Sequence, residues 1–233
     1  MLNSKNILAI IPARIGSKGI KFKNLKKVNN TTLLGHAIIC LKKIKFIDRI
    51  FVSTDSKKIT NEASNYNIET PFLRPKKLSG DRISDYQVVK DVLLKIERHD
   101  NKKYDVVLLI QPTSPFRLPA DIIKSTKTLI KTNADSVWSV SKLDSKMHPL
   151  KQLKIYKKKI SFFIKSGAKI VARQQLSDLY YRNGICYAIK RSTILNKKSV
   201  KGNFCIPLLI KRQVVNIDNY FDLKLANFLY KKS

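Results

Sequence analysis

Short apolar runs alternate with segments of helical periodicity along most of the 233-residue chain. The apolar runs predict buried strands at 7–11, 49–52, 106–110 and 136–140. Apolar residues spaced three to four positions apart predict helices at 32–44, 56–66, 84–98 and 119–130. This alternation predicts an α/β fold with a doubly wound, Rossmann-like, mostly parallel sheet.

The stretch from Lys142 to about Tyr180 breaks this rhythm. Two short runs, 153–155 and 160–164, predict a hairpin inserted between core elements. A run at 185–189 then resumes the sheet, and the amphipathic segment 219–229 predicts a closing helix. We therefore expect a single domain over 1–233 that carries a small inserted lobe at about 142–180.

The composition indicates a folded protein that does not span a membrane. Apolar residues make up 43% of the chain, but no apolar run reaches the roughly 18 residues that a membrane span needs. The stretch Met1–Asn6 lacks the apolar core of a signal peptide. Cys40, Cys186 and Cys205 are far apart and lack CxxC spacing, so we expect reduced core cysteines and a cytoplasmic location.

The formal net charge of +31 needs an interpretation. One alternative is nucleic-acid binding, because a basic surface attracts phosphates. However, the lysines are scattered as pairs, and no zinc-finger spacing or aromatic RNA-binding pattern accompanies them. We interpret the charge mainly as lysine-rich composition, expect no nucleic-acid partner, and expect the positive field to favour a polyanionic substrate.

The end of the first strand carries the clearest candidate chemistry. Gly16 and Gly19 allow a tight loop whose amides can face phosphate oxygens, while Arg14 and Lys18 supply cations. Lys23 follows at a distance that could return to the same place. The pattern matches neither a Walker A loop nor G-x-G-x-x-G, and an ordinary solvated turn is the alternative.

Six ordered blocks resemble the CMP-sialic acid synthetases, which belong to the acylneuraminate cytidylyltransferase family. The resemblance covers about residues 7–229. It rests on these segments: IPARIGSKGI at 11–20 with Lys23 and Asn24, VSTD at 52–55, PFLRP at 71–75, LIQPTSPFR at 109–117, HPLK at 148–151 with Arg173, and NGICY at 183–187.

The resemblance implies a specific reaction. The anomeric hydroxyl of a nonulosonic acid, which is a nine-carbon sialic-acid-like sugar, attacks the α-phosphate of CTP and expels pyrophosphate, with Mg²⁺ or Mn²⁺ as cofactor. It implies catalytic roles for Arg14, Lys18 and Lys23. It implies nucleotide contacts by Ala13, Arg14, Ser17, Lys23, Asn24, Arg74 and Ser84, and sugar contacts by Gln111 and Tyr187. Helix capping by Ser84, a surface position for Arg74 and core packing of Tyr187 are the alternatives.

Two positions depart from the family pattern. The family usually carries Asp-Ile-Asp near its C-terminus as metal ligands, whereas this chain has Asn216 and Asp218 around Ile217. We keep both as metal-ligand candidates, although the lost charge should weaken the site. Arg182 lies one position later than the family arginine, so its role stays open.

The family's lobe crosses to a second subunit and helps to close its active site. The resemblance therefore implies a homodimer in which Lys151 and Arg173 contact the sugar bound to the partner subunit. The alternative is a lobe that folds back on its own domain.

Two other functions remain as alternatives. A CMP-KDO synthetase would share the fold and the reaction, but Ser17-Lys18-Gly19 departs from that family's Ser-x-Arg-x-Pro loop. A non-catalytic, basic nucleic-acid-binding module would account for the charge and for Asn216. The sequence does not distinguish neuraminate, legionaminate and pseudaminate as the sugar.

Overall fold

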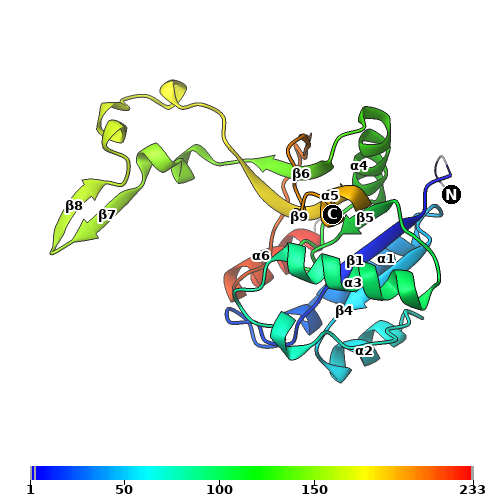
Figure 1. Cartoon of the computed structure of the whole chain (residues 1–233). Helices are drawn as coiled ribbons and strands as arrows, with labels where there is room; N and C mark the ends of the chain where they lie inside the picture. Colours follow the sequence, from blue (N-terminus) through cyan, green and yellow to red (C-terminus); the bar gives the residue numbers. More distant parts are fainter. Residues whose placement is uncertain (1, 3, 232–233) are drawn as a thin grey trace.

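The computed structural model describes residue 2 and residues 4–231, so positions 1 and 3 of the N-terminal stretch lie outside the described residues. Its centre is a six-stranded sheet (Figure 1). The strand order is β10 (Cys205–Leu209), β6 (Ser136–Lys142), β9 (Tyr180–Lys190), β5 (Val106–Leu109), β1 (Ile7–Pro12) and β4 (Arg49–Ser53). Only β9 runs antiparallel to its neighbours among the described strands of this sheet, which confirms a mostly parallel arrangement.

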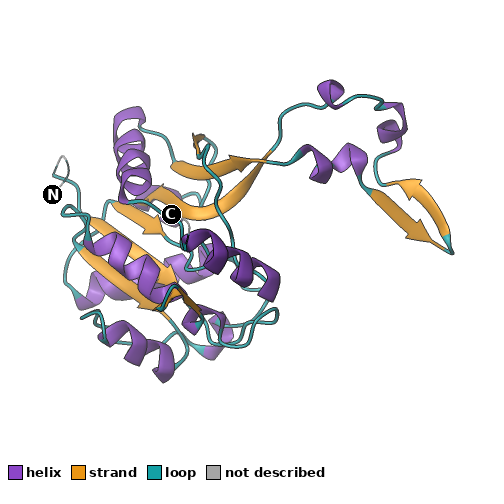
Figure 2. Ribbon diagram, turned by 180° about the vertical axis from the view of Figure 1, so that it is seen from behind, coloured by secondary structure: helices purple, strands orange, loops and turns teal. Residues whose placement is uncertain are grey.

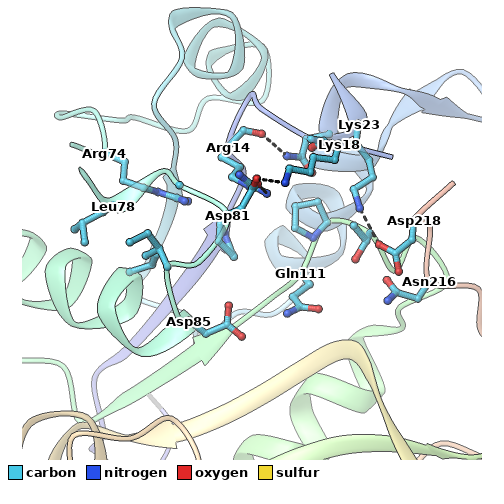
Figure 3. Close-up of a pocket in the computed structure, with 18 residues that line it drawn as sticks. Arg14, Lys18, Lys23, Arg74, Leu78, Asp81, Asp85, Gln111, Asn216 and Asp218 are labelled. Carbon is cyan, nitrogen blue, oxygen red and sulfur yellow. Dashed lines mark hydrogen bonds and ion pairs between the residues drawn. The ribbon is translucent and has the colours of Figure 1, made fainter. Parts of the chain in front are cut away.

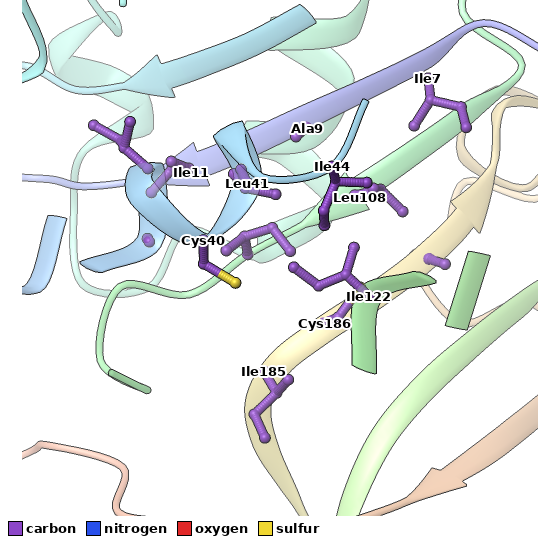
Figure 4. Close-up of a cluster of buried hydrophobic side chains, with 14 of the residues drawn as sticks. Ile7, Ala9, Ile11, Cys40, Leu41, Ile44, Leu108, Ile122, Ile185 and Cys186 are labelled. Atoms are coloured by element: carbon purple, nitrogen blue, oxygen red, sulfur yellow. The ribbon is translucent and has the colours of Figure 1, made fainter. Parts of the chain in front are cut away.

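Both faces of the sheet are covered by helices, as a doubly wound fold requires (Figure 2). Alternate side chains of β1 point to opposite faces of the sheet and pack into two different layers. Ile7, Ala9 and Ile11 pack into the cluster that contains α1 (Leu33–Lys42), α2 (Lys57–Ser64) and α4 (Pro119–Thr132), part of which is drawn in Figure 4. Leu8 and Ile10 pack into the opposite cluster with α3 (Asp85–His99) and α5 (Arg191–Leu195). The continuous apolar run at 7–11 therefore reflects burial on both faces.

Side-chain caps fix where the helices begin. Thr32 accepts a hydrogen bond from the amide of Gly35 at α1, and Ser56 accepts one from Lys58 at α2, as its sequence position predicts. Ser84 forms a capping box with Gln87 at α3.

The closing helix predicted at 219–229 is confirmed as α6 (Tyr220–Tyr230). Its Ala226 packs with Ile217 and with Val28 of the small ribbon formed by β2 (Lys27–Val28) and β3 (Thr31–Thr32).

The predicted hairpin is present as β7 (Leu153–Tyr156) and β8 (Lys159–Phe162), paired antiparallel. It belongs to an arm between β6 and β9 that projects far from the sheet (Figure 1). Short 3-10 turns complete the arm: η3 (Ser145–Met147), η4 (Pro149–Lys151), η5 (Lys165–Lys169) and η6 (Arg173–Gln175). Every residue of both hairpin strands is exposed.

The fold departs from the sequence-based prediction at several elements. β9 is eleven residues long rather than five, because the chain returns from the arm and extends the sheet from Tyr180 onward. The edge strand β10 and the short helix α5 were not predicted.

The described cysteines are free, as expected. Cys40 and Cys186 are buried, and this burial raises the pKa of the Cys40 thiol to about 11 and that of Cys186 to about 12. Cys205 is only half-buried, which differs from the core position expected for it. Among the described residues, no helix is long and apolar enough to cross a membrane.

Candidate active site

A cavity of about 330 Å³ opens beyond the carboxyl ends of β1 and β5, beside the N-terminus of α3 (Figure 3). Ligands bind at this edge of doubly wound sheets. Loops that lie far apart in the sequence contribute its walls: Pro12, Arg14, Ser17, Lys18, Lys23, Asn24, Arg74, Leu78, Gly80, Asp81, Ile83, Asp85, Val88, Gln111, Pro112, Thr113, Asn216 and Asp218. Nine of the predicted site residues are among them: Arg14, Ser17, Lys18, Lys23, Asn24, Arg74, Gln111, Asn216 and Asp218.

Backbone and side-chain hydrogen bonds shape the glycine-containing loop after β1. The Ile15 amide donates to the Asp55 carboxylate at 2.9 Å, and the Asn24 side-chain amide donates to the Arg14 carbonyl at 3.0 Å. A Cβ atom at Gly19 would lie 2.2 Å from the carbonyl oxygen of Asp218. Glycine at position 19 therefore lets the loop approach the segment that carries the candidate metal ligands. By contrast, Gly16 has open space around it.

Three cations of this loop pair with carboxylates of the cavity. Arg14 Nη2 and Lys18 Nζ lie 2.7 Å from the two carboxylate oxygens of Asp81, and Lys23 Nζ lies 2.9 Å from Asp218 Oδ1. Hydrogen bonds from Lys18 and Arg14 lower the pKa of Asp81. The cavity thus holds positively charged groups that already have acidic partners.

Arg74 is buried, contrary to the surface alternative. Its Nε donates to Ser53 Oγ at 3.0 Å and its Nη2 donates to the Ser53 carbonyl at 2.5 Å. Burial lowers the pKa of the guanidinium, with the nearby positive charge of Arg14 acting in the same direction. Hydrogen bonds to the end of β4 therefore fix Arg74 in the cavity wall.

Gln111 and Asp85 point into the cavity (Figure 3). Gly184 approaches Gln111 so closely, with φ of +72°, that a Cβ atom there would lie 2.7 Å from Gln111 Oε1. The carboxylate of Asp85 has no hydrogen bond or ion pair within the described part of the chain. Partial burial raises its pKa, against the lowering effect of Arg182 and Arg74.

The two metal-ligand candidates lie side by side in the cavity wall (Figure 3). Between them, the Ile217 amide donates to the Thr113 carbonyl at 2.8 Å, which holds their segment against the loop that follows β5. Asn216 Oδ1 is buried and has no hydrogen-bond partner among the residues that the structure describes. No group of three or more His, Cys, Asp or Glu side chains with metal-binding geometry occurs among the described residues.

Five predicted residues lie outside the cavity wall. Ala13 is buried beneath the loop, and the Ser84 side chain caps α3. Tyr187 is 2% exposed, accepts a hydrogen bond from the Gly184 amide and packs on Trp138, so the structure favours the core-packing alternative for it. Lys151 and Arg173 belong to η4 and η6 of the arm.

Arg182 packs its guanidinium over the Trp138 ring, 5.4 Å from the ring centroid. An irregularity interrupts the pairing of β6 with β9 between Trp138 and Val140. The face of the sheet on which the Arg182 side chain lies therefore cannot be deduced from simple alternation of side chains along β9.

Two acidic wall residues, Asp81 and Asp85, were missed by sequence reasoning. Sequence analysis identifies a phosphate site by its cationic side chains. The two carboxylates come close to these cations only in the folded chain. Asp81 lies on the segment that leads from η2 (Lys76–Leu78) to α3.

Similarity to known proteins agrees with this geometry. The family described as cytidylyltransferase matches residues 8–226. The chain is 32% identical to the CMP-N,N'-diacetyllegionaminic acid synthase of Legionella pneumophila, over 96% of this chain and 95% of that protein. It is 30% identical to the post-translational flagellin modification protein B of Campylobacter coli, over 97% and 95% of the two chains.

The solved structure of CMP:2-keto-3-deoxy-manno-octonic acid synthetase complexed with CTP has the same fold. The two structures superpose with a TM-score of 0.73 over 97% of this chain and 99% of the other, at 13% identity. At that identity the likeness shows the fold alone. The matched sequence family spans nearly the whole chain, and this protein belongs to the cytidylyltransferase family.

Proposed function

We propose that this enzyme transfers CMP from CTP to a nonulosonic acid and releases pyrophosphate. The observation that carries the proposal is the convergence of Arg14, Lys18 and Lys23 in one cavity with Asp218. The relatives named for legionaminic acid support the class of sugar, and we leave the individual sugar open.

The chain's cations suit a triphosphate. During the attack of the anomeric oxygen on the α-phosphate, negative charge builds up on the phosphate oxygens and on the departing pyrophosphate. Arg14, Lys18 and Lys23 would neutralise that charge, and an arginine fork adds orientation to charge. Arg74 and Asn24 would hold the cytidine, and Gln111 would contact the sugar.

Asn216 and Asp218 fit a hard divalent cation. Both offer oxygen atoms, and Oδ1 of Asn216, which lacks a partner within 4–231, is an acceptor that a cation would satisfy. Mg²⁺ commonly takes one or two protein oxygens and completes its shell with water and substrate phosphates, which suits a site without a cluster of acids. A bound Mg²⁺ or Mn²⁺ would polarise phosphate oxygens.

We also propose that the enzyme acts as a homodimer in the cytoplasm. Lys151 and Arg173 lie on the arm, outside the cavity of their own chain, so the proposed sugar contacts require the cavity of a second chain.

Pyrophosphate release tests the reaction. The purified protein is incubated with CTP, Mg²⁺ and, in parallel, neuraminate, legionaminate, pseudaminate or the eight-carbon acid KDO. We expect CTP-dependent release with at least one nine-carbon acid and none when chelator replaces the metal. Turnover with KDO alone would replace the proposal by the KDO synthetase alternative, and turnover with none of the acids would refute it.

A further inference from the structure

The Asp81 carboxylate bridges two cations of the glycine-containing loop after β1, Arg14 and Lys18 (Figure 3). One oxygen contacts Arg14 Nη2 and the other contacts Lys18 Nζ, each at 2.7 Å. Arg14 Nη1 also donates to the Ser79 carbonyl at 3.3 Å, so the segment 79–81 is fastened to the loop at two points. Asp81 lies 67 positions from Arg14 and 63 positions from Lys18 in sequence, and only the fold brings the three together.

These ion pairs contribute little to the stability of the fold. The side chains of Lys18, Asp81 and Arg14 are 83%, 39% and 32% exposed. Exposed pairs of this kind contribute little net stability, because water screens the charges and ordering the side chains costs entropy. The arrangement of these ion pairs is therefore better explained by a role of Arg14 and Lys18 in ligand binding than by a contribution to folding.

A bound triphosphate would accept hydrogen bonds from the same N–H groups of Arg14 and Lys18 that now donate to Asp81. The carboxylate presents two negatively charged oxygens to Arg14 and Lys18, much as a phosphate would. A phosphate drawn to those cations would also be repelled by Asp81 at short range. Asp81 and the triphosphate are consequently in competition for Arg14 and Lys18.

The third pair, Lys23 with Asp218, differs in one respect. If Lys23 turns to a phosphate, Asp218 can turn to the divalent cation that accompanies the nucleotide, so both groups keep a partner. Within the described part of the chain, Asp81 has no other cationic partner at salt-bridge distance.

We propose that Asp81 is a placeholder anion, by which we mean a carboxylate that orients Arg14 and Lys18 and is exchanged for the triphosphate when the nucleotide binds. Asp81 is thus a positioning residue that sets how strongly the loop holds phosphate. The proposal rests on the proposed nucleotide site, but its consequence for phosphate binding can be measured without turnover.

The test is calorimetric binding to wild type, Asp81→Asn and Asp81→Ala. The probes are inorganic tripolyphosphate, CTP and cytidine, in chelator, so that no metal bridges Asp218 to phosphate. Loss of two exposed pairs predicts roughly three- to tenfold tighter binding of tripolyphosphate and CTP, with cytidine unchanged. With metal and sugar present, KM for CTP should fall by a similar factor while KM for the sugar stays constant.

Glu69→Gln is the matched control, because Glu69 forms an exposed ion pair with Arg49 outside the cavity and its loss raises the net charge equally. An equal gain in this control would assign the effect to overall charge and overturn the proposal. Unchanged or weaker tripolyphosphate binding in both Asp81 variants would also overturn it. Tighter binding of tripolyphosphate by the Asp81 variants than by wild type, without CTP binding by any of the proteins, would refute the proposed function. The placeholder role of Asp81 would then still stand.

Discussion

Arg14 and Lys18 supply positive charge where the proposed reaction develops negative charge. Replacing either by Ala should lower turnover about 10²-fold or more, because lost transition-state stabilisation of this kind is worth about 3 kcal/mol. Steady-state pyrophosphate release with CTP and the preferred sugar measures the loss. Circular dichroism should show intact folding, since the Lys18 side chain is 83% exposed.

Lys21→Ala is the control for this pair of variants. Lys21 belongs to the same loop but lies outside the cavity wall, near the Phe22 ring. Its replacement should leave turnover within about twofold of wild type. Activity within threefold of wild type in both Arg14→Ala and Lys18→Ala would remove these cations from the mechanism.

Asp85 has the chemistry to distinguish cytosine from uracil. Its carboxylate faces the cavity without a partner among the described residues, directly after Ser84 and near Arg74. A carboxylate accepts from the 4-amino group of cytosine and repels the 4-keto oxygen of uracil. Asp85→Ala should therefore lower the preference for CTP over UTP, by about tenfold if one hydrogen bond carries it.

The ratio of kcat/KM for CTP to that for UTP is the measurement. Asp91→Asn is the control, because Asp91 pairs with Lys95 on the same helix and is absent from the cavity wall. An unchanged ratio in Asp85→Ala would exclude Asp85 from base recognition.

The cations of the site and Asp218 were proposed from the sequence and the family resemblance, whereas the acidic wall residues Asp81 and Asp85 were not. A loop with glycines, arginine and lysine after a buried strand has a recognisable pattern, and the family resemblance assigned Lys23 and Arg74 as well. Asp81 and Asp85 lie between η2 and the first turn of α3, where acidic residues are ordinary helix-start composition. Their position in the cavity depends on how α3 packs against β1.

At the level of elements, strands β1, β4, β5 and β6 were predicted and the edge strand β10 was not. β10 contains Pro207, which weakens a strand pattern. A polar junction rather than an apolar run determines where β10 begins. Asp135 accepts from the amides of Asn203 and Phe204, at 2.8 and 2.9 Å, and from Lys197. Gly202 has φ of +70°, and a Cβ there would lie 2.4 Å from Asp135 Cβ.

This junction predicts a pH-dependent contribution to stability. The Lys197 hydrogen bond and the backbone amides lower the pKa of Asp135 from 3.8 to about 2. A carboxyl with a lowered folded-state pKa stabilises the fold above its unfolded value and loses that contribution as pH falls from about 4 to about 2. Asp135→Asn should therefore lower the urea midpoint at pH 7, and the difference from wild type should shrink toward pH 2.5. A difference that stays constant with pH would show that the charge of Asp135 does not stabilise the junction.

The segment between β10 and α6 carries the metal prediction. Asn216→Asp adds a charge beside Asp218, so activity should saturate at a lower Mg²⁺ concentration, by severalfold or more. Without metal the two adjacent carboxylates repel, so the variant should melt below wild type in chelator and recover with Mn²⁺. Thermal melts at increasing Mn²⁺ provide a readout that is independent of turnover. Identical metal titrations for both proteins would place Asn216 outside the coordination sphere.

At the scale of the whole molecule, the net charge of +31 is not concentrated in the cavity. Four cationic side chains and three carboxylates line it: Arg14, Lys18, Lys23, Arg74, Asp81, Asp85 and Asp218. The basic surface can attract an anionic substrate from a distance, but specificity at short range depends on this nearly balanced set.

The projecting arm exposes apolar surface that a lone chain leaves in water. Ile155, Ile160 and Phe163 are 75%, 67% and 63% exposed, and two-stranded hairpins are at best marginally stable by themselves. Exposed apolar patches of this kind are typical of association sites. Sequence analysis predicted the hairpin from its apolar runs, but its distance from the sheet depends on how the chain leaves β6 and enters β9.

Mixing two inactive variants tests whether the arm completes the site of a second chain. Lys18→Ala disables the cavity and Lys151→Ala disables the arm, so each homodimer should be inactive. After subunit exchange at equal concentrations, half of the dimers are mixed, and each mixed dimer pairs one intact cavity with one intact arm. Activity should therefore recover to about a quarter of wild type. Labelled subunits monitor the exchange, and light scattering gives the assembly state. A monomer in solution, or no recovery after demonstrated exchange, would mean that the arm serves its own chain.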